Sequence, residues 1–263
     1  RAAGAAVAAT DAVIDGAVDN AFCSVRPPGH HATPRETMGF CFFGNVAIAW
    51  EASGLGLGLA NSLVYATVSA ALAVLIAALA AFAVVIMPMG RPALWFWLIY
   101  AGTLLPLQIF LAPLFKVYVA TGTYDTTLGM VIIYAAICVP FAFFVTRNFL
   151  TTMPAEITEA AQLDGAKWGR IFFQIHLPLL KSALFAAFIF QFTWVWNDYL
   201  FGITLTTSPD RRPVMAALAE INGGFAALGP PVVLAAALVA SIPTVILFLS
   251  FQRFFVSSLR ATA

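Results

Sequence analysis

Few side chains in this sequence have the type and spacing that covalent or metal chemistry requires. The three cysteines, Cys23, Cys41 and Cys138, have neither the spacing of metal ligands nor an even number, so they indicate neither a zinc site nor a disulfide framework. The sequence contains no Gly-x-x-x-x-Gly-Lys-Ser/Thr segment, the loop that holds the phosphates of a bound nucleotide. These observations predict a protein with no resident metal or cofactor and no catalytic residues.

One carboxylate, Asp198, lies in a strongly apolar stretch, and ionisable groups in such stretches are candidates for solute pathways. If the apolar segment begins near Ser182, Asp198 lies about 24 Å along it at about 1.5 Å per residue. That is near the far side of a hydrocarbon core of about 30 Å. We therefore expect an interfacial position, and we take Trp196, Asn197 and Asp198 as candidate solute-pathway residues. The alternative is an interfacial group without contact with solute.

The composition indicates that these residues belong to an integral membrane protein. Apolar residues make up 62% of the chain and charged residues 10%, against about 45–50% and about 25% in soluble domains. No charged residue occurs between Glu51 and Arg91, and other intervals are almost as long. A spanning helix needs about 20 apolar residues. We predict five spans, near 61–86, 94–115, 127–148, 182–206 and 231–253; the alternative is a large soluble protein with buried helices.

The positions of Lys and Arg predict the orientation of these spans, because short loops that carry them tend to stay in the cytoplasm. With the 147–181 loop inside, seven basic residues lie on the inner side and three on the outer side. The inner seven are Arg91, Arg147, Lys167, Arg170, Lys181, Arg253 and Arg260, and the outer three are Lys116, Arg211 and Arg212. A net charge of +1 supplies no basic face, so we expect no nucleic-acid partner.

The segment 154–178 predicts two short helices joined by a turn. Pro154 suits a first helical turn, and Glu156 and Glu159 lie near the positive end of the helix dipole. Asp164-Gly165 is a turn signal, and we expect a second helix to run until Pro178 stops it. The small side chains of Ala160 and Ala161 would let another surface approach closely. The alternative is a solvated amphipathic loop.

The same segment resembles the EAA loop of ABC importer permeases. The matching positions are Glu159-Ala160-Ala161, then Gly165, then Ile175, Leu177 and Pro178. Further positions resemble the maltose-type sugar permeases, so that the resemblance covers about 61–259: Asn61-Ser62, Trp196-Asn197-Asp198 and Gln252-Arg253-Phe254-Phe255-Val256. The sequence departs from the family pattern in two ways. The family's usual first span is missing, and the family's usual C-terminal glycines are absent from the stretch after Val256.

The resemblance implies an all-α membrane fold of about five spans, over residues 53–263, with a cytoplasmic coupling loop at 150–181. It implies ATPase contacts at Glu159, Ala160, Ala161, Asp164, Gly165, Ile175, Leu177 and Pro178. It also implies an ABC ATPase, a second permease subunit and an extracytoplasmic sugar-binding protein as partners. The implied place is the bacterial cytoplasmic (inner) membrane, in contact with lipid, and the implied function is a non-enzymatic subunit of a carbohydrate importer.

The first 50 residues resemble a different family, the histone deacetylases and acetylpolyamine amidohydrolases. The matching segments are Cys23 to Ala32 and Gly39 to Ile48. The resemblance implies that His30 and His31 are the general acid and base beside a catalytic zinc. A catalytic zinc needs three protein ligands, and the family's Asp-x-His and later Asp do not occur. We therefore interpret residues 1–52 as a poorly folded fragment, joined by gene fusion or by an assembly error.

Two alternatives to the transport subunit remain. One is an inactive zinc deacetylase-like protein with a membrane anchor, and the other is a membrane scaffold that has lost transport. Residues 38–60 contain only Glu51 as a charge and could form a poor sixth span.

Overall fold

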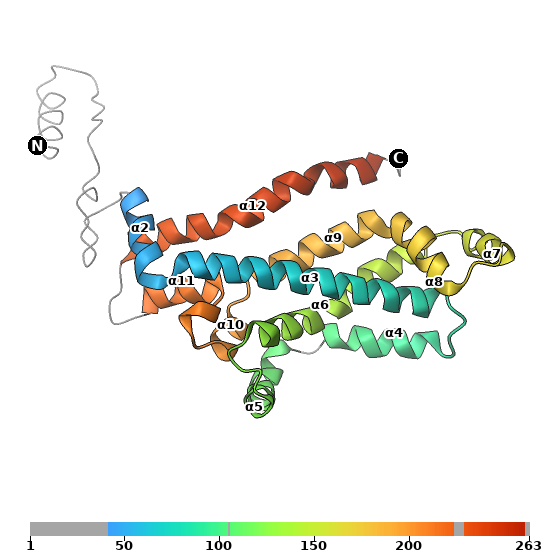
Figure 1. Cartoon of the computed structure of the whole chain (residues 1–263). Coiled ribbons are helices and arrows are strands. Elements are labelled where there is room, and N and C mark those ends of the chain that lie inside the picture. The colour runs from blue at the N-terminus through green and yellow to red at the C-terminus, as the bar shows by residue number, and fades with distance from the viewer. Residues whose placement is uncertain (1–41, 105, 224–228, 261–263) are drawn as a thin grey trace, which may run out of the picture. The chain divides into compact units, whose positions relative to one another are not determined.

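The computed structural model describes residues 42–104, 106–223 and 229–260, and its regular elements there are all helices (Figure 1). The chain divides into two compact units, one of residues 1–56 and 217–241 and the other of residues 57–216 and 242–263. His30, His31, Cys23 and Cys41 lie outside the described residues. The smaller unit contains α2 (Phe42–Ser53), most of α11 (Val214–Gly223) and the start of α12 (Pro230–Arg260). The second unit contains the candidate functional site.

Helix α3 (Leu55–Val85) has no charged residue in 31 positions. Its buried positions recur every three or four residues and are mostly small, with Ala66, Ala70, Ala73 and Ala77 fully buried. Large apolar side chains such as Leu72 face outward. Small side chains on the inner stripe let a neighbouring helix approach closely, and the exposed apolar side suits lipid. The Oγ of Ser69 donates to the carbonyl of Val131, 3.1 Å away on α6.

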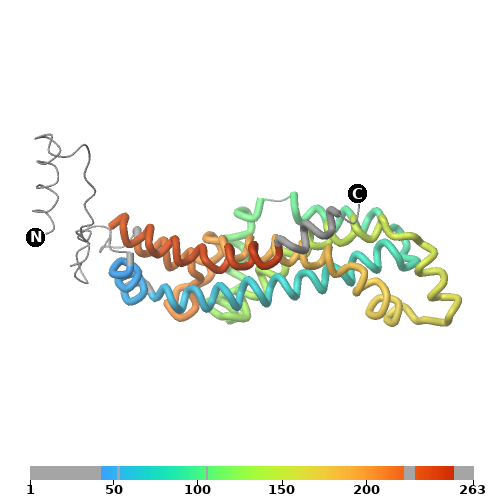
Figure 2. The backbone as a smooth tube through the Cα atoms, turned by 90° about the horizontal axis from the view of Figure 1, so that it is seen from above, coloured from blue at the N-terminus to red at the C-terminus, as the bar shows by residue number. Residues whose placement is uncertain are grey.

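Helices α6 (Thr127–Leu150) and α9 (Leu177–Trp196) pack against each other in the second unit, and α3 lies beside α6 (Figures 1 and 2). The Oγ1 of Thr126 caps α6 by accepting from the N–H of Gly129 at 3.0 Å. The helices α4 and α5 follow α3 in sequence. Figure 1 shows α7 at one end of this unit and α5 and α10 at the other.

The predicted span 94–115 is not one straight helix. Helix α4 (Pro92–Tyr100) continues as a 3-10 turn, η2 (Ala101–Thr103), and a second turn, η3 (Leu107–Phe110), leads into α5 (Leu111–Thr121). The two halves meet at 84°. Pro106 has an extended conformation and no N–H to donate, so the helix cannot continue through it. The sequence places Pro106 inside this span, where a kink is expected, but it does not give the size of the bend.

Four described helices are long and apolar enough to cross a membrane, and the bent pair makes a fifth if it is one span. The predicted span 182–206 is broken after Trp196, and a short helix, α10 (Leu200–Leu205), follows the break. The 3-10 turn η5 (Pro209–Arg211) then leads to α11. Helix α2 has only 12 residues and is not one of these candidate spans, so the described residues contain no span at 38–60.

Polar contacts tie together the end of this unit that holds α5 and α10. The carboxylate of Asp125 accepts from the N–H groups of Thr207 at 2.9 Å and Ser208 at 3.2 Å, and from the hydroxyl of Ser208. Burial alone would raise the pKa of Asp125, but these hydrogen bonds outweigh it and lower the pKa. Asn61 donates to the carbonyls of Asp210 and Arg212. This network, together with the contacts of Tyr65, Tyr124 and Arg211, is called the polar latch below.

Candidate functional site

The segment from Thr151 to His176 forms a helical hairpin at the other end of the same unit. Helix α7 (Glu156–Leu163) begins after the Pro154 turn, with Glu156 and Glu159 in its first turn. Carboxylates there interact favourably with the helix dipole. The two short helices predicted from the sequence are therefore present, with different lengths from those expected.

The turn after α7 is a Schellman motif centred on Gly165. The N–H of Ala166 donates to the carbonyl of Ala161 at 3.0 Å, and the N–H of Gly165 donates to that of Gln162 at 2.9 Å. Gly165 has φ +76°, a conformation that glycine adopts at little cost. A Cβ built there would have no neighbouring atom of the chain within 4 Å, so the surface around Gly165 is open.

The two alanines of the hairpin face opposite ways. Ala160 is exposed, whereas Ala161 is buried in an apolar cluster with Phe82, Ile171 and Phe172. Ala161 is therefore not available to another protein, and Ala160 is the alanine at which a partner could approach closely. The reason is the helical spacing, since Thr158 and Ala161, three residues apart, make up the buried side of α7.

Glu159 is exposed beside a hollow of about 490 Å³. Its other walls come from the end of α3 and from Pro88, Gln162 and Trp168. Asp164 is also exposed. The exposed surface of the hairpin therefore presents three carboxylates, those of Glu156, Glu159 and Asp164, and an open glycine turn.

Pro178 does not end the second helix. The turn α8 (Trp168–Arg170) continues through a π-helical segment, η4 (Ile171–His176), directly into α9. The N–H of Leu177 donates to the carbonyl of Phe172, five residues earlier. A π turn is wider than an α turn, which relieves the clash between a proline ring and the carbonyl four residues before it. Pro178 is exposed, and Ile175 and Leu177 are half-buried.

His176 joins the hairpin to the helix bundle, and the sequence analysis did not single it out. Its Nε2 lies 3.0 Å from the Oγ1 of Thr158, and both side chains are buried. Its ring packs against Phe82 of α3, with ring centroids 5.2 Å apart. The Nδ1 is buried without a hydrogen-bond partner. Sequence spacing gives no signal for this contact, because the two residues are 18 positions apart on different elements.

The three candidate solute-pathway residues do not share one environment. Trp196 is buried and stacks on Phe192, with centroids 5.7 Å apart. Asn197 and Asp198 line a hollow of about 590 Å³ with Trp194. An Asp198 oxygen accepts from the hydroxyl of Tyr134 at 2.8 Å and from two N–H groups at the start of α10. Asp198 therefore also holds the break between α9 and α10 in place.

A metal site is not evident in the part of the chain that the structure describes, where no three His, Cys, Asp or Glu side chains cluster. Residues 65–261 match the sequence profile of the family described as "Binding-protein-dependent transport system inner membrane component". This chain belongs to that family. The all-α, multi-pass inner-membrane fold predicted from the sequence is confirmed.

Named relatives agree with this family. The alpha-glucoside transport system permease protein AglG of Rhizobium meliloti is 32% identical over 222 residues, which cover 82% of this chain. The melibiose/raffinose/stachyose import permease protein MelC of Bacillus subtilis is 32% identical over 222 residues, 84% of this chain and 80% of that protein. The chain spans only 58% of the length of the Rhizobium protein.

A solved structure shares the fold. It belongs to a bacterial ABC transporter involved in the import of the acidic polysaccharide alginate, with a TM-score of 0.68 and 20% identity over 80% of this chain and 79% of that one. Residues 1–55 separately match the histone deacetylase domain, as their resemblance predicted. Most of that segment lies outside the described residues.

Proposed function

We propose that this chain is a permease subunit of an ATP-driven carbohydrate importer and that it couples to a separate ATPase through residues 150–181. The observation that carries the proposal is the two-sided hairpin. Its inner side, with Thr158 and Ala161, is packed against α3 and η4, and its outer side, with Glu159, Ala160 and Gly165, is open. A partner that displaces α7 therefore acts on the transmembrane helices.

The partner is an ABC ATPase that receives the hairpin in a cleft. The exposed carboxylates of the hairpin, three in number, exceed its two exposed basic residues, Lys167 and Arg170, so its surface has a small negative charge that suits a cleft with basic residues. Ala160 and the open Gly165 turn let the backbone of the partner approach closely. A second permease subunit completes the pathway, and an extracytoplasmic binding protein delivers the solute.

The substrate class is a carbohydrate, in line with the names of the two relatives. Asn197 and Asp198 line the first part of the solute pathway in this subunit. Their hollow contains polar atoms beside the ring of Trp194, a combination that fits a sugar ring with polar edges and apolar faces. Trp196 contributes packing to the same region, because it is buried.

Cysteine labelling tests the proposed orientation, in which the hairpin is cytoplasmic and the polar latch is extracytoplasmic. In a chain whose native cysteines are replaced by serine, Leu163→Cys and Asp210→Cys place single thiols at exposed positions of the two ends. A membrane-impermeant maleimide should label Asp210→Cys in intact spheroplasts and Leu163→Cys only after lysis. Labelling of both from one side would contradict the orientation.

Coupling is tested in the complex of the full chain with an ATPase, a second permease subunit and a binding protein. We expect Glu159→Lys to reduce sugar-stimulated ATP hydrolysis and to weaken retention of the ATPase. The matched control is Glu156→Lys, in the same first turn. Hydrolysis and retention equal to those of the wild type in Glu159→Lys would mean that the hairpin is only a solvated connection.

A further inference from the structure

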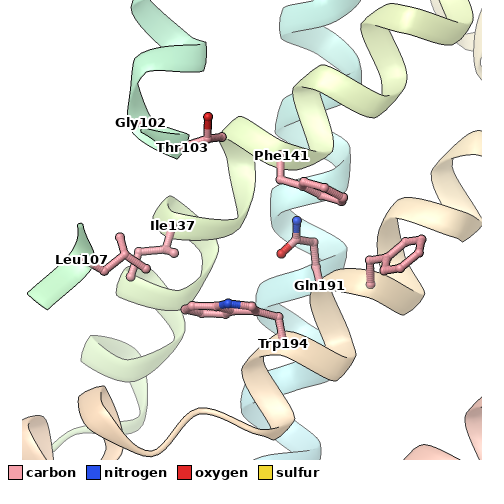
Figure 3. Close-up of a pocket in the computed structure, with 8 residues that line it drawn as sticks. Gly102, Thr103, Leu107, Ile137, Phe141, Gln191 and Trp194 are labelled. Atoms are coloured by element: carbon pink, nitrogen blue, oxygen red, sulfur yellow. The ribbon is translucent and has the colours of Figure 1, made fainter. Parts of the chain in front are cut away.

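A further cavity, open on one side, lies beside the break between α4 and α5, nearer the start of α9 than Asn197. It has a volume of about 330 Å³. Its walls come from α6, from α9 and from the two 3-10 turns, through Gly102, Thr103, Leu107, Ile137, Phe141, Phe190, Gln191 and Trp194 (Figure 3). Phe190 and Trp194 also line the hollow at Asn197 and Asp198, so the two spaces share a wall.

Gln191 is the unusual side chain of this cavity. Its residue is only 5% exposed, yet its carboxamide makes no hydrogen bond within the part of the chain that the structure describes. Figure 3 shows the carboxamide between the rings of Phe141 and Trp194, turned into the cavity. A carboxamide turned into a mostly apolar cavity is placed to hydrogen-bond a polar partner that enters the cavity.

The broken helix next to Gln191 points to the same place independently. Irregular backbone at membrane depth is tolerated where it is covered by protein or lines a cavity, and transporters place solute sites beside such breaks. Gly102 lets the break lie against α6, because a Cβ there would be 2.8 Å from Cγ of Pro140. The hydroxyl of Thr103 donates to the carbonyl of Tyr100 at 2.7 Å and so satisfies part of the broken turn.

We propose that this cavity binds one ring of a neutral, polyhydroxylated solute. The carboxamide of Gln191 donates to and accepts from the hydroxyl groups of that solute, and the rings of Trp194 and Phe141 cover its apolar C–H faces. None of the described residues that line the cavity is charged, so a phosphorylated or carboxylated sugar finds no counter-ion among them. The volume is near the lower end for small-molecule sites, which limits occupancy to about one ring.

This inference rests on the proposed function and deepens it by naming the solute class and a residue that contacts it. A lipid chain is the competing occupant, because the cavity walls are mostly apolar. A lipid tail would leave the carboxamide of Gln191 without a partner, whereas a sugar hydroxyl satisfies both its donor and its acceptor. The observations therefore favour the sugar.

The first experiment measures binding to the full chain in lipid nanodiscs by saturation-transfer NMR, with maltose, melibiose and trehalose as neutral probes and glucose 6-phosphate as the charged probe. We expect at least one neutral probe to bind and the charged probe not to bind. Gln191→Leu should weaken binding about tenfold, the equivalent of one lost hydrogen bond or two. Gln108→Leu, at an exposed glutamine of η3 outside the cavity, should bind like the wild type.

Stability separates a binding role from a structural one. Replacing an unpartnered buried amide with an apolar side chain of similar size is neutral or stabilising, so the unfolding midpoint of Gln191→Leu should not fall. The inference is overturned if no neutral probe binds, if Gln191→Leu binds as well as the wild type, or if weaker binding comes with a lower midpoint.

The second experiment measures uptake of radiolabelled maltose, melibiose and trehalose by vesicles that contain the complete complex. A wild-type complex that takes up none of them contradicts the proposed function. A complex that transports one of these sugars equally well with Gln191→Leu contradicts only the assignment of this cavity. We expect Gln191→Leu to reduce uptake about tenfold at low sugar concentration, with the ATPase still bound.

Discussion

The two ends of the second unit are held together by different kinds of contact. The hairpin end is packed mainly through apolar side chains, with Phe82 in contact with Trp168, Phe172 and His176. The other end is held by the polar latch, in which side chains bond to the backbone of residues 207–212. Figure 1 shows these ends as the regions around α7 and around α5 and α10.

This difference indicates which end of the second unit is better suited to movement. Apolar contacts are non-directional, so α7 can shift against α3 by a small amount and keep most of its buried area. Hydrogen bonds weaken steeply when their geometry changes, so the polar latch resists displacement. A subunit that receives force from an ATPase at one end and meets a binding protein at the other would use both properties.

Removing the central ring of the hairpin end should give the largest effect. Phe82 is 3% exposed, and Phe82→Ala should lower the free energy of unfolding by about 3–5 kcal/mol. Trypsin should then cut faster at Lys167 and Arg170 in detergent micelles. Leu79→Ala is the control, because Leu79 lies on the same helix but is 43% exposed. Equal cleavage in the two variants would show that Phe82 does not anchor the hairpin.

Opening the polar latch should have the next largest effect, at the other end only. Asp125→Ala removes the acceptor for residues 207 and 208 and places alanine at φ +56°. We expect a loss of about 2–3 kcal/mol and faster tryptic cleavage after Arg211. Asp125→Asn, which tolerates this φ and keeps one acceptor oxygen, should lose less. Faster cleavage at Lys167 in Asp125→Ala would mean that the two ends are not independent.

The pH dependence of the polar latch follows from the lowered pKa of Asp125. A carboxylate with a lowered pKa stabilises the folded state above the unfolded pKa of about 3.9, and this contribution is lost as the pH falls through the folded value. Cleavage after Arg211, divided at each pH by the cleavage of an unstructured peptide, should therefore be constant from about pH 5 to 8. At lower pH the cleavage should rise in the wild type as Asp125 is protonated, and Asp125→Asn should remove this rise.

A smaller effect is expected from the buried contact between α7 and η4. Thr158→Val removes the partner of the Nε2 of His176 and should cost about 1–2 kcal/mol. Thr158→Ser keeps the hydroxyl and is the control. The unfolding midpoint and sugar-stimulated ATP hydrolysis of the complex should both fall in the valine variant. A valine variant with unchanged hydrolysis would show that this contact does not transmit coupling.

The smallest effect is expected at Gly165. Gly165→Ala should cost about 1 kcal/mol through its positive φ alone, since the chain leaves room for the methyl group. Gly169→Ala, at an exposed glycine of α8 that also has room and has no positive φ, should be neutral. A loss of ATPase retention much larger than the loss of stability would indicate that the partner contacts residue 165 directly.

The sequence predicted the helices well where a long interval without charged residues is enough to indicate a membrane span. The charge-free interval from Glu51 to Arg91 predicted α3, although the helix begins at Leu55 rather than at residue 61. A kink at Pro106 was expected from the sequence but its 84° angle was not, and Pro178 was wrongly predicted to end a helix, because a proline in an apolar stretch can end, bend or widen a helix. Neighbouring helices decide among these outcomes.

The candidate site was predicted only on its exposed side. Glu159 and Gly165 could be found from a local pattern of residues. Thr158, His176 and Gln191 could not, because their roles depend on burial and on contacts between elements far apart in the sequence. The sequence does not show whether an isolated polar residue in an apolar run has a hydrogen-bond partner in the folded chain.

The π turn of η4 has a mechanical consequence for the helix that carries Gln191. Residues 168–196 form one rod, and Gln191 lies 15 residues beyond His176, or about 22 Å at 1.5 Å per residue. A wide turn followed by a proline is the most easily bent part of such a helix. A push on α7 is therefore taken up first as bending within residues 171–178. Only the remaining displacement reaches the cavity at Gln191, so the stiffness of these eight residues sets how far this part of the helix moves.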